Sequence, residues 1–237
     1  MRSIKVLAVV AALLPSVALG EIGNKPLRGS LPGESAVGRL VVAGKAMCTG
    51  ALIAPDTVLT AAHCLYDPRT GKRVSDSTVE FQAGLKGGLA KAVRQVKRAT
   101  VHPEYVHRPK ANAQLGYDLA VLKLSKPISK NTVIPVQYGA RLSDGDLLGV
   151  VSYTINNRND PMMEYPCRVL ARQDETLVMN CEVTSGASGA PVLALSKNGR
   201  TPLLVSVVSA KAAMGGQNVS VGTVLSADAM RWMIAGG

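Results

Sequence analysis

The sequence predicts an all-β protein made of two packed β units, with a short helix at the C-terminus. Short runs rich in Val, Leu, Ile and Thr recur along the chain, separated by Pro, Gly, Asn and Asp, which is typical of antiparallel sheets. The runs fall into two sets joined by a polar stretch near residues 125–146, and helix signals are scarce. The 237 residues suit one large all-β domain or two small ones, and with 3% aromatic residues the core must consist of Val, Leu, Ile and Ala.

The first twenty residues have the pattern of an export signal. Basic Arg2 and Lys5 precede an apolar run over residues 6–14, which is too short to span a bilayer. Small residues then allow cleavage after Gly20 or, nearly as well, after Ala18. Because no second hydrophobic stretch of comparable length follows, we expect an exported protein, secreted or periplasmic, without stable membrane association.

Residues 21–36 are rich in Gly, Pro and charge, and they predict an extended arm or a propeptide. The first β unit is expected over residues 37–135. Its predicted strands are VGRLVVA, TGALIA, TVLT, TVEFQAG, RQVKRATV and LAVLKL.

The second β unit is expected over residues 136–237. Its predicted strands are LLGVVSYT, CRVL, LVMNC, APVLAL, LLVSVV and SVGTVL. After the last strand, Ser226 is positioned to cap a short helix over ADAMRWMIA, with Asp228 in the first turn.

The chain is basic, with a net charge of +11 at pH 7. Removal of residues 1–20 would leave about +9. Basic residues in the stretch 91–110 are spread among Val and Ala, as on the solvated face of strands, although they can also attract acidic substrates or anionic surfaces. Nucleic acid is not expected as a partner, because aromatic residues that stack on bases are nearly absent and no finger or helix-turn-helix signature is present.

Four cysteines in an exported chain predict two disulfides. Three connectivities are possible, and sequence proximity favours Cys48 with Cys64 and Cys167 with Cys181. Each of these pairs would close a loop of about fifteen residues and contribute about 3 kcal/mol to stability. No metal is expected, because neither pair has the short spacing of a zinc knuckle.

Three segments carry the side chains of a nucleophilic catalyst. LTAAHC contains His63, YDLAVLKL contains Asp118, and TSGASGAPVL contains Ser188. A neutral imidazole accepts the proton of a serine hydroxyl when a carboxylate fixes its tautomer and stabilises the imidazolium, so the three residue types are needed together. Each residue alone has an ordinary structural interpretation, whereas the combination predicts a catalytic triad.

The glycine two residues before the serine predicts an oxyanion hole. Gly186 permits a tight turn, so that its N–H group and that of Ser188 can converge on one point and stabilise a developing oxyanion. The segment is not a lipase elbow, which needs glycine where Ala190 stands.

These segments resemble those of trypsin-like serine proteases of the chymotrypsin fold, in particular the compact secreted bacterial members. The similarity covers CTGALIAPDTVLTAAHC, HPEY followed by YDLAVLKLSKPI, and GASGAPV, within residues 37–235. It implies two packed six-stranded antiparallel β-barrels and a peptide or protein substrate. We expect a monomer, but nothing in the sequence determines the oligomeric state. No cofactor is expected, since no phosphate loop, dinucleotide fingerprint or His-rich metal motif is present.

The resemblance also implies a role for each residue of the three segments. His63 would be the general base and then the general acid, Asp118 its orienting partner, and Ser188 the nucleophile, with Gly186 and Ser188 forming the oxyanion hole. The strand VSVVSAK is similar to the one whose backbone pairs with an extended substrate, and the expected substrate-binding edge is Ser209, Ala210 and Lys211.

The sequence departs from the family pattern at two positions. Ala187 stands where trypsin-type zymogens carry the aspartate that receives the new N-terminal amine, so this activating ion pair cannot form. Lys211 stands approximately where the family often has glycine at the entrance to the specificity pocket, and its long side chain would narrow that pocket.

Glu182 lies six residues before Ser188, where trypsin-like enzymes place the acidic residue of the pocket, which hints at Arg or Lys in the substrate. The histidine of glutamate-specific relatives aligns with Val207 or Val208, so a preference for Glu is unsupported.

Two alternatives accompany this interpretation. His102 and His107 are the rival bases, but both lie in a polar, basic stretch and are expected on the surface or in loops. A catalytically silent relative that uses the same fold as a binding or adhesive module is the alternative function, and the intact triad argues against it.

Overall fold

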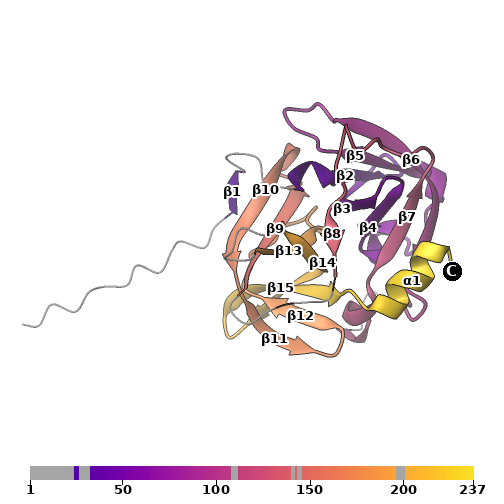
Figure 1. Ribbon diagram of the computed structural model, residues 1–237. Coiled ribbons are helices and arrows are strands. Elements are labelled where there is room, and N and C mark those ends of the chain that lie inside the picture. Colours follow the sequence, from indigo (N-terminus) through magenta and orange to yellow (C-terminus); the bar gives the residue numbers. More distant parts are fainter. Residues whose placement is uncertain (1–23, 27–32, 108–111, 140–141, 143–145, 196–200) are drawn as a thin grey trace, which may run out of the picture.

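The computed structural model describes residues 24–26, 33–107, 112–139, 142, 146–195 and 201–237. The described chain consists mainly of strands arranged in two units side by side (Figure 1), which confirms the predicted all-β class. The predicted export signal lies outside the described residues, as does most of the predicted arm.

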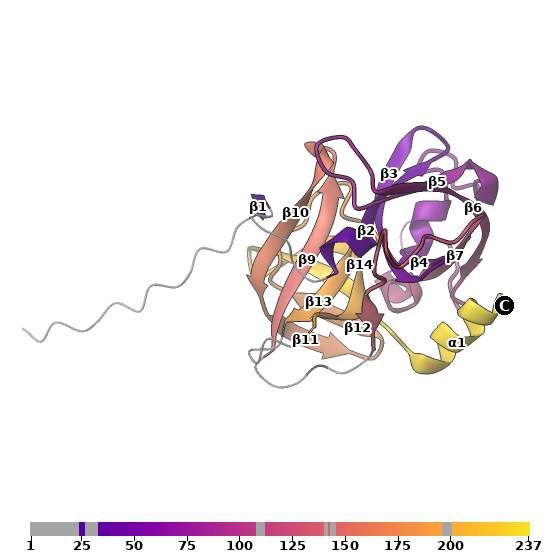
Figure 2. The ribbon, with the colours of Figure 1, turned by 45° about the horizontal axis from the view of Figure 1, so that its top comes forward.

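The first unit is a closed six-stranded barrel, visible as a ring of strands in Figure 2. Its strands are β2 (Val37–Val42), β3 (Ala46–Ala54), β4 (Thr57–Thr60), β5 (Val79–Ala83), β6 (Ala92–Val101) and β7 (Ala120–Leu124), paired in the order β2-β3-β4-β7-β6-β5. Burial alternates along β5, where Val79, Phe81 and Ala83 face the core, as the two-residue period of a strand requires.

The second unit is a nine-stranded sheet that repeats this strand order. Its strands include β9 (Leu147–Thr154), β10 (Asn157–Cys167), β11 (Val169–Gln173), β12 (Thr176–Met179), β13 (Pro191–Leu195), β14 (Leu203–Met214) and β15 (Gln217–Val224). The path β10-β9-β13-β14-β15-β12 matches β3-β2-β5-β6-β7-β4 of the first barrel. At the other end of this path, β11 pairs with β12. Only Arg168 separates β11 from β10 in the sequence, so the chain connects the two ends of the path.

Two short strands extend this sheet. β1 (Asn24–Pro26), from the predicted arm, pairs antiparallel with β10, and β8 (Gln137–Tyr138) runs parallel to β14. Within the described residues, four 3-10 helices connect the strands: η1 (Glu34–Ala36), η2 (Ala62–Leu65), η3 (Asp76–Thr78) and η4 (Asn112–Tyr117). η2 contains His63, and η4 ends one residue before Asp118.

The C-terminal helix α1 (Ala227–Ala235) forms where the sequence predicts it. Ser226 occupies the N-cap position, but its side chain makes no capping hydrogen bond, so that part of the prediction is wrong. The helix leaves the second unit and packs on the first barrel near β6 and β7 (Figure 1), where Met230 and Met233 enter the core. In the part of the chain that the structure describes, no helix is both long and apolar enough to cross a membrane.

Both disulfides favoured by sequence proximity are present. Cys48 on β3 is bonded to Cys64 in η2, and Cys167 at the end of β10 is bonded to Cys181, two residues after β12. The first therefore fixes the turn that carries His63, and the second links β10 to the segment that leads to Ser188.

Candidate active site

His63 and Asp118 form a hydrogen-bonded pair at one end of the first barrel. The His63 Nδ1 atom lies 2.6 Å from Asp118 Oδ2, and the His63 backbone N–H donates to Asp118 Oδ1 at 2.8 Å. Only 5% of the Asp118 side chain is exposed, against 32% of the His63 side chain. With Nδ1 held by the buried carboxylate, the imidazole has one orientation, and its Nε2 atom is left for another partner.

The carboxylate also controls the charge of the imidazole. Burial is the largest influence on the pKa of His63 and favours the neutral ring, but the hydrogen bond and the charge of Asp118 together outweigh it. The pKa of His63 is therefore raised above its usual value, as expected for a base whose protonated form is stabilised.

Ser209 supplies a third hydrogen bond to Asp118. Its Oγ atom donates to Asp118 Oδ2, and the residue is 7% exposed. The register of β14 against β15 shifts between Val208 and Ala210, so a bulge at Ser209 directs its side chain toward the carboxylate. The sequence places Ser209 at the substrate-binding edge, whereas its side chain belongs to the support of Asp118.

The turn that carries Ser188 is hydrogen-bonded to the first barrel, which also carries His63. The Thr49 backbone N–H donates to the Ser188 carbonyl at 2.8 Å, one residue from the Cys48–Cys64 disulfide. Gly189 lies so close to Thr60 and Ala61 that an added Cβ would be 2.1 Å from Thr60 Oγ1. Ser188 is consequently held beside the segment that leads into His63.

The backbone around Ser188 leaves two N–H groups available. Between Gly186 and Ala190, the N–H groups of Ala187, Gly189 and Ala190 donate to backbone carbonyls. Among the described residues, no acceptor is found for the N–H groups of Gly186 and Ser188, the two predicted oxyanion donors. Gly186 has φ +102°, and an added Cβ would lie 2.8 Å from the Tyr153 carbonyl oxygen, so only glycine fits this turn.

Thr49 is a residue of this site that sequence reasoning missed. It is fully buried, and its Oγ1 donates to the Gly186 carbonyl at 3.0 Å and accepts from the Tyr153 N–H at 3.0 Å. Together with its backbone bond to Ser188, these contacts join the first barrel to both ends of the Gly186–Ser188 turn. The only sequence signal is its place next to Cys48.

Thr49→Val tests this positioning role. The substitution leaves a buried N–H and a buried carbonyl without their partner, which is expected to destabilise the fold by about 1–3 kcal/mol. Because the Gly186 carbonyl would lose its anchor, we expect kcat to fall roughly tenfold with little change in KM. Thr57→Val, at another buried threonine of the same barrel whose Oγ1 bonds Asp56, is the control for kcat. An unchanged kcat in Thr49→Val would show that the threonine is structural only.

A model of the family named Trypsin matches residues 22–233. The chain belongs to the trypsin family. Among solved structures, a Glu endopeptidase in complex with MPD superposes with a TM-score of 0.73 at 19% identity, covering 92% of this chain and 98% of that one. The thermostable serine protease AL20 from an extremophilic microorganism superposes with a TM-score of 0.65 at 18% identity, covering 85% and 97%.

Curated relatives match over shorter segments. Serine protease 23 of Homo sapiens is 30% identical over 162 residues, which is 61% of this chain and 42% of that protein. Trypsin of Saccharopolyspora erythraea is 33% identical over 87 residues, which is 37% of this chain and 34% of that protein. The chain thus aligns with about two fifths of the first of these relatives.

In this trypsin-family chain, β14 has one edge without a strand partner beyond Val208. β13 pairs with β14 as far as Val207, whereas β15 covers β14 to Met214. Among the described residues, the other edge of Ser209–Met214 is therefore left open to an extended peptide. Lys211 is exposed on this segment, opposite Ser220 of β15.

Glu182 is exposed next to the Cys167–Cys181 disulfide. Its backbone N–H donates to Glu164 Oε1 at 3.3 Å, and Glu164 is a buried residue of β10 with 2% exposure. Sequence reasoning missed Glu164, because the polar and proline-containing stretch around it does not read as a strand.

The rival histidines have other partners. His102 lies in the loop directly after β6 and is only 6% exposed, because its ring packs against Tyr117. Its backbone N–H donates to the Leu119 carbonyl at 2.8 Å. Burial lowers its pKa. The His107 ring stacks on Tyr66 at 4.1 Å between centroids.

One cluster of potential metal ligands contains His63. Ligand atoms of Cys48, His63 and Cys64 lie within 4.8 Å of one another. The two sulfur atoms are joined in a disulfide, so they are not available as thiolate ligands.

Proposed function

We propose that this protein is an exported serine endopeptidase that hydrolyses peptide bonds through an acyl-enzyme on Ser188. The observation that best supports this proposal is the 2.6 Å hydrogen bond between His63 Nδ1 and the buried Asp118. This pair belongs to the first barrel, to which the Ser188 turn is hydrogen-bonded. An imidazole with a raised pKa and one orientation suits a general base at neutral pH.

In acylation, Ser188 Oγ attacks the carbonyl carbon of the scissile bond and His63 Nε2 takes its proton. The N–H groups of Gly186 and Ser188 stabilise the oxyanion. Collapse of the tetrahedral intermediate breaks the C–N bond, and His63 gives its proton to the leaving amine. In deacylation, water repeats the attack with His63 as base, and Ser188 is regenerated.

The substrate is a peptide or protein that adds a strand to the open edge of β14 at Ser209, Ala210 and Lys211. Glu182 is the acidic group that would attract Arg or Lys on the acyl side of the scissile bond. The long side chain of Lys211 narrows the entrance to the specificity pocket. We propose no cofactor and no metal in this mechanism.

For the organisation of the chain, we propose a signal over residues 1–20, an arm or propeptide over 21–36, and barrel units over 37–135 and 136–237. The mature protein is secreted or periplasmic and monomeric, with no nucleic-acid partner and no stable membrane association. Because Ala187 replaces the acidic acceptor of an N-terminal amine, activity does not depend on an N-terminal Ile or Val.

Digestion of a peptide library with the purified, oxidised, processed protein tests this function. We expect cleavage within peptides, and enrichment of Arg or Lys before the cleaved bond if Glu182 acts as proposed. Cleavage without that enrichment would remove the role of Glu182 alone. No cleavage of any peptide would favour the catalytically silent module.

A further inference from the structure

Most of the net positive charge of the chain lies in residues 37–135. Residues 37–135 contain 15 Lys and Arg against 6 Asp and Glu, a net charge of +9, whereas residues 136–237 contain 8 of each kind. The candidate active site borders both halves, so a substrate there approaches a half with a net charge of +9 and a half with none.

A short cationic hairpin (residues 66–73) projects from the first barrel directly after the η2 turn that carries His63. Tyr66 and Arg73 pair across its base, the Asp67 N–H donates to the Lys72 carbonyl at 2.8 Å, and the Gly71 N–H donates to the Asp67 carbonyl at 2.8 Å. The cationic hairpin is therefore a defined backbone structure.

The one acidic side chain of the cationic hairpin is used to build it. Asp67 Oδ1 accepts from the backbone N–H groups of Arg69 and Thr70, each at 2.9 Å. The Thr70 N–H is the largest of the influences that lower the pKa of Asp67, so its carboxylate stays ionised and engaged.

Two of the three cations of the cationic hairpin are left for other partners. Arg73 binds Asp76 at 2.8 Å and the Ala99 carbonyl at 2.9 Å. Arg69 and Lys72 are exposed, and among the described residues neither has a salt bridge, while the charge of Arg69 helps to lower the pKa of Asp67. Their charged groups are exposed to solvent, on a backbone that the hydrogen bonds of the hairpin hold in place.

The cationic hairpin is bound to the segment of the first barrel that carries His63. The Tyr66 N–H donates to the His63 carbonyl, and the Tyr66 ring stacks on His107, which bonds the Tyr105 hydroxyl at 3.0 Å. Burial and then the charge of Asp118 raise the pKa of Tyr105. Arg69 and Lys72 follow His63 by six and nine residues in the sequence, and the base of the cationic hairpin is hydrogen-bonded to the His63 carbonyl.

From this placement we propose that Arg69 and Lys72 recognise acidic side chains in the substrate, close to the scissile bond but outside the specificity pocket. The inference rests on the proposed endopeptidase function and adds a substrate class to it, namely peptides with Asp or Glu flanking the cleaved bond. Two solvated ion pairs on a preformed hairpin would change kcat/KM by roughly tenfold at low salt.

The experiment compares two peptides with the same cleaved bond, one with Glu and one with Gln at the flanking positions. We expect the unmodified enzyme to prefer the Glu peptide by about tenfold in kcat/KM at low salt, and by less at high salt. Arg69→Gln with Lys72→Gln is expected to bring the ratio close to one and to leave the Gln peptide unaffected.

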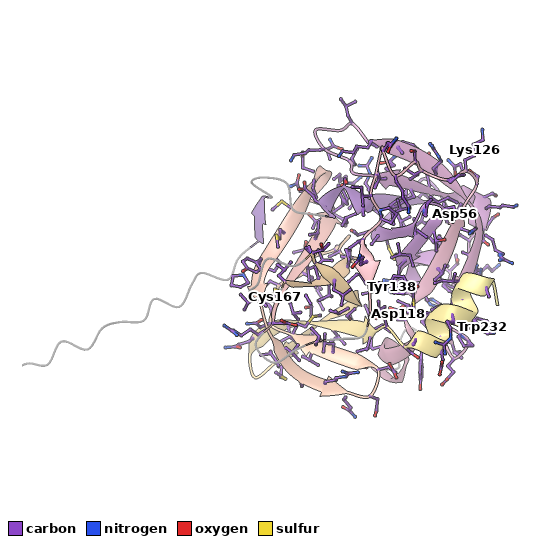
Figure 3. The ribbon with its side chains drawn as sticks, in the orientation of Figure 1. Asp56, Asp118, Lys126, Tyr138, Cys167 and Trp232 are labelled. Carbon is purple, nitrogen blue, oxygen red and sulfur yellow. A yellow bond between two sulfur atoms is a disulfide. The ribbon has the colours of Figure 1, made fainter. Side chains whose placement is uncertain are left out.

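The matched control is Lys126→Gln with Lys130→Gln, which removes the same charge from an exposed loop. Lys126 lies at the outer side of the first barrel, far from Asp118 (Figure 3). We expect this variant to keep the Glu preference. An equal loss in both variants, or no preference in the unmodified enzyme, would overturn the role of the cationic hairpin. Cleavage of neither peptide would overturn the proposed function itself, and this inference with it.

Asp67→Ala tests whether the preference for the Glu peptide depends on the backbone geometry of the cationic hairpin or on its charge alone. It makes the cationic hairpin more positive but removes the acceptor of two backbone N–H groups. If the fixed backbone matters, the Glu preference falls. A larger preference would show that charge alone attracts the substrate and would overturn recognition by a preformed hairpin.

Discussion

Ser188→Ala is expected to abolish peptide hydrolysis, with a loss of kcat of about a million-fold, as for nucleophile removal in other serine proteases. The physical reason is that no acyl-enzyme can form once the hydroxyl is gone. The fold should persist, because it is the Ser188 backbone carbonyl that accepts the hydrogen bond from Thr49. The melting temperature is expected to change by only a few degrees.

The measurement is peptide turnover together with thermal unfolding of both proteins. Ser185→Ala is the matched control, since Ser185 is exposed three residues earlier in the same segment and carries no proposed role in catalysis. Retained hydrolysis in Ser188→Ala would show that the nucleophile is a different residue.

Asp118→Asn is expected to lower kcat by about ten thousand-fold at neutral pH, because an amide cannot hold His63 in the required tautomer or stabilise its imidazolium. The pH profile should shift as well. Catalysis needs the neutral imidazole, so activity is lost as the pH falls through the pKa of His63, which Asp118 raises. Without the carboxylate that pKa falls, and the acidic limb of the profile moves to lower pH.

The measurement is kcat as a function of pH for both proteins. Asp56→Asn is the control, because Asp56 is an Asp of the same barrel that is paired with Lys123 at 2.8 Å and lies apart from Asp118 (Figure 3). Asp56→Asn should leave the acidic limb of the pH profile of kcat unchanged. An acidic limb at the same pH in Asp118→Asn would show that Asp118 does not set the charge of His63.

Much of the fold could be predicted because most strands have the simple signature of apolar residues between turn residues. β10 was largely missed, since NRNDPMMEYPC contains Asn, Asp and two prolines that favour turns. It is a strand because β9 and β1 bind its two edges, and pairing with distant segments is not visible in local composition. The burial of Glu164 follows from the same pairing.

The candidate site was predicted in part. His63, Asp118 and Ser188 lie in segments with strong local patterns, so their chemistry could be inferred before their geometry was known. Thr49 could not be found in this way, because its role depends on the contact between the first barrel and the Gly186–Ser188 turn. The hydrogen bond from the Ser209 side chain to Asp118 could not be predicted either, because the bulge that turns this side chain toward Asp118 exists only in the paired strands.

Labelling with a fluorophosphonate, followed by peptide mapping, tests directly whether Ser188 is an activated nucleophile. Such a reagent phosphonylates a serine only when an adjacent base and an oxyanion hole activate it. We expect one adduct in the processed, oxidised protein, located on Ser188, and none in Ser188→Ala. An unlabelled protein, or an adduct on another serine, would contradict this expectation.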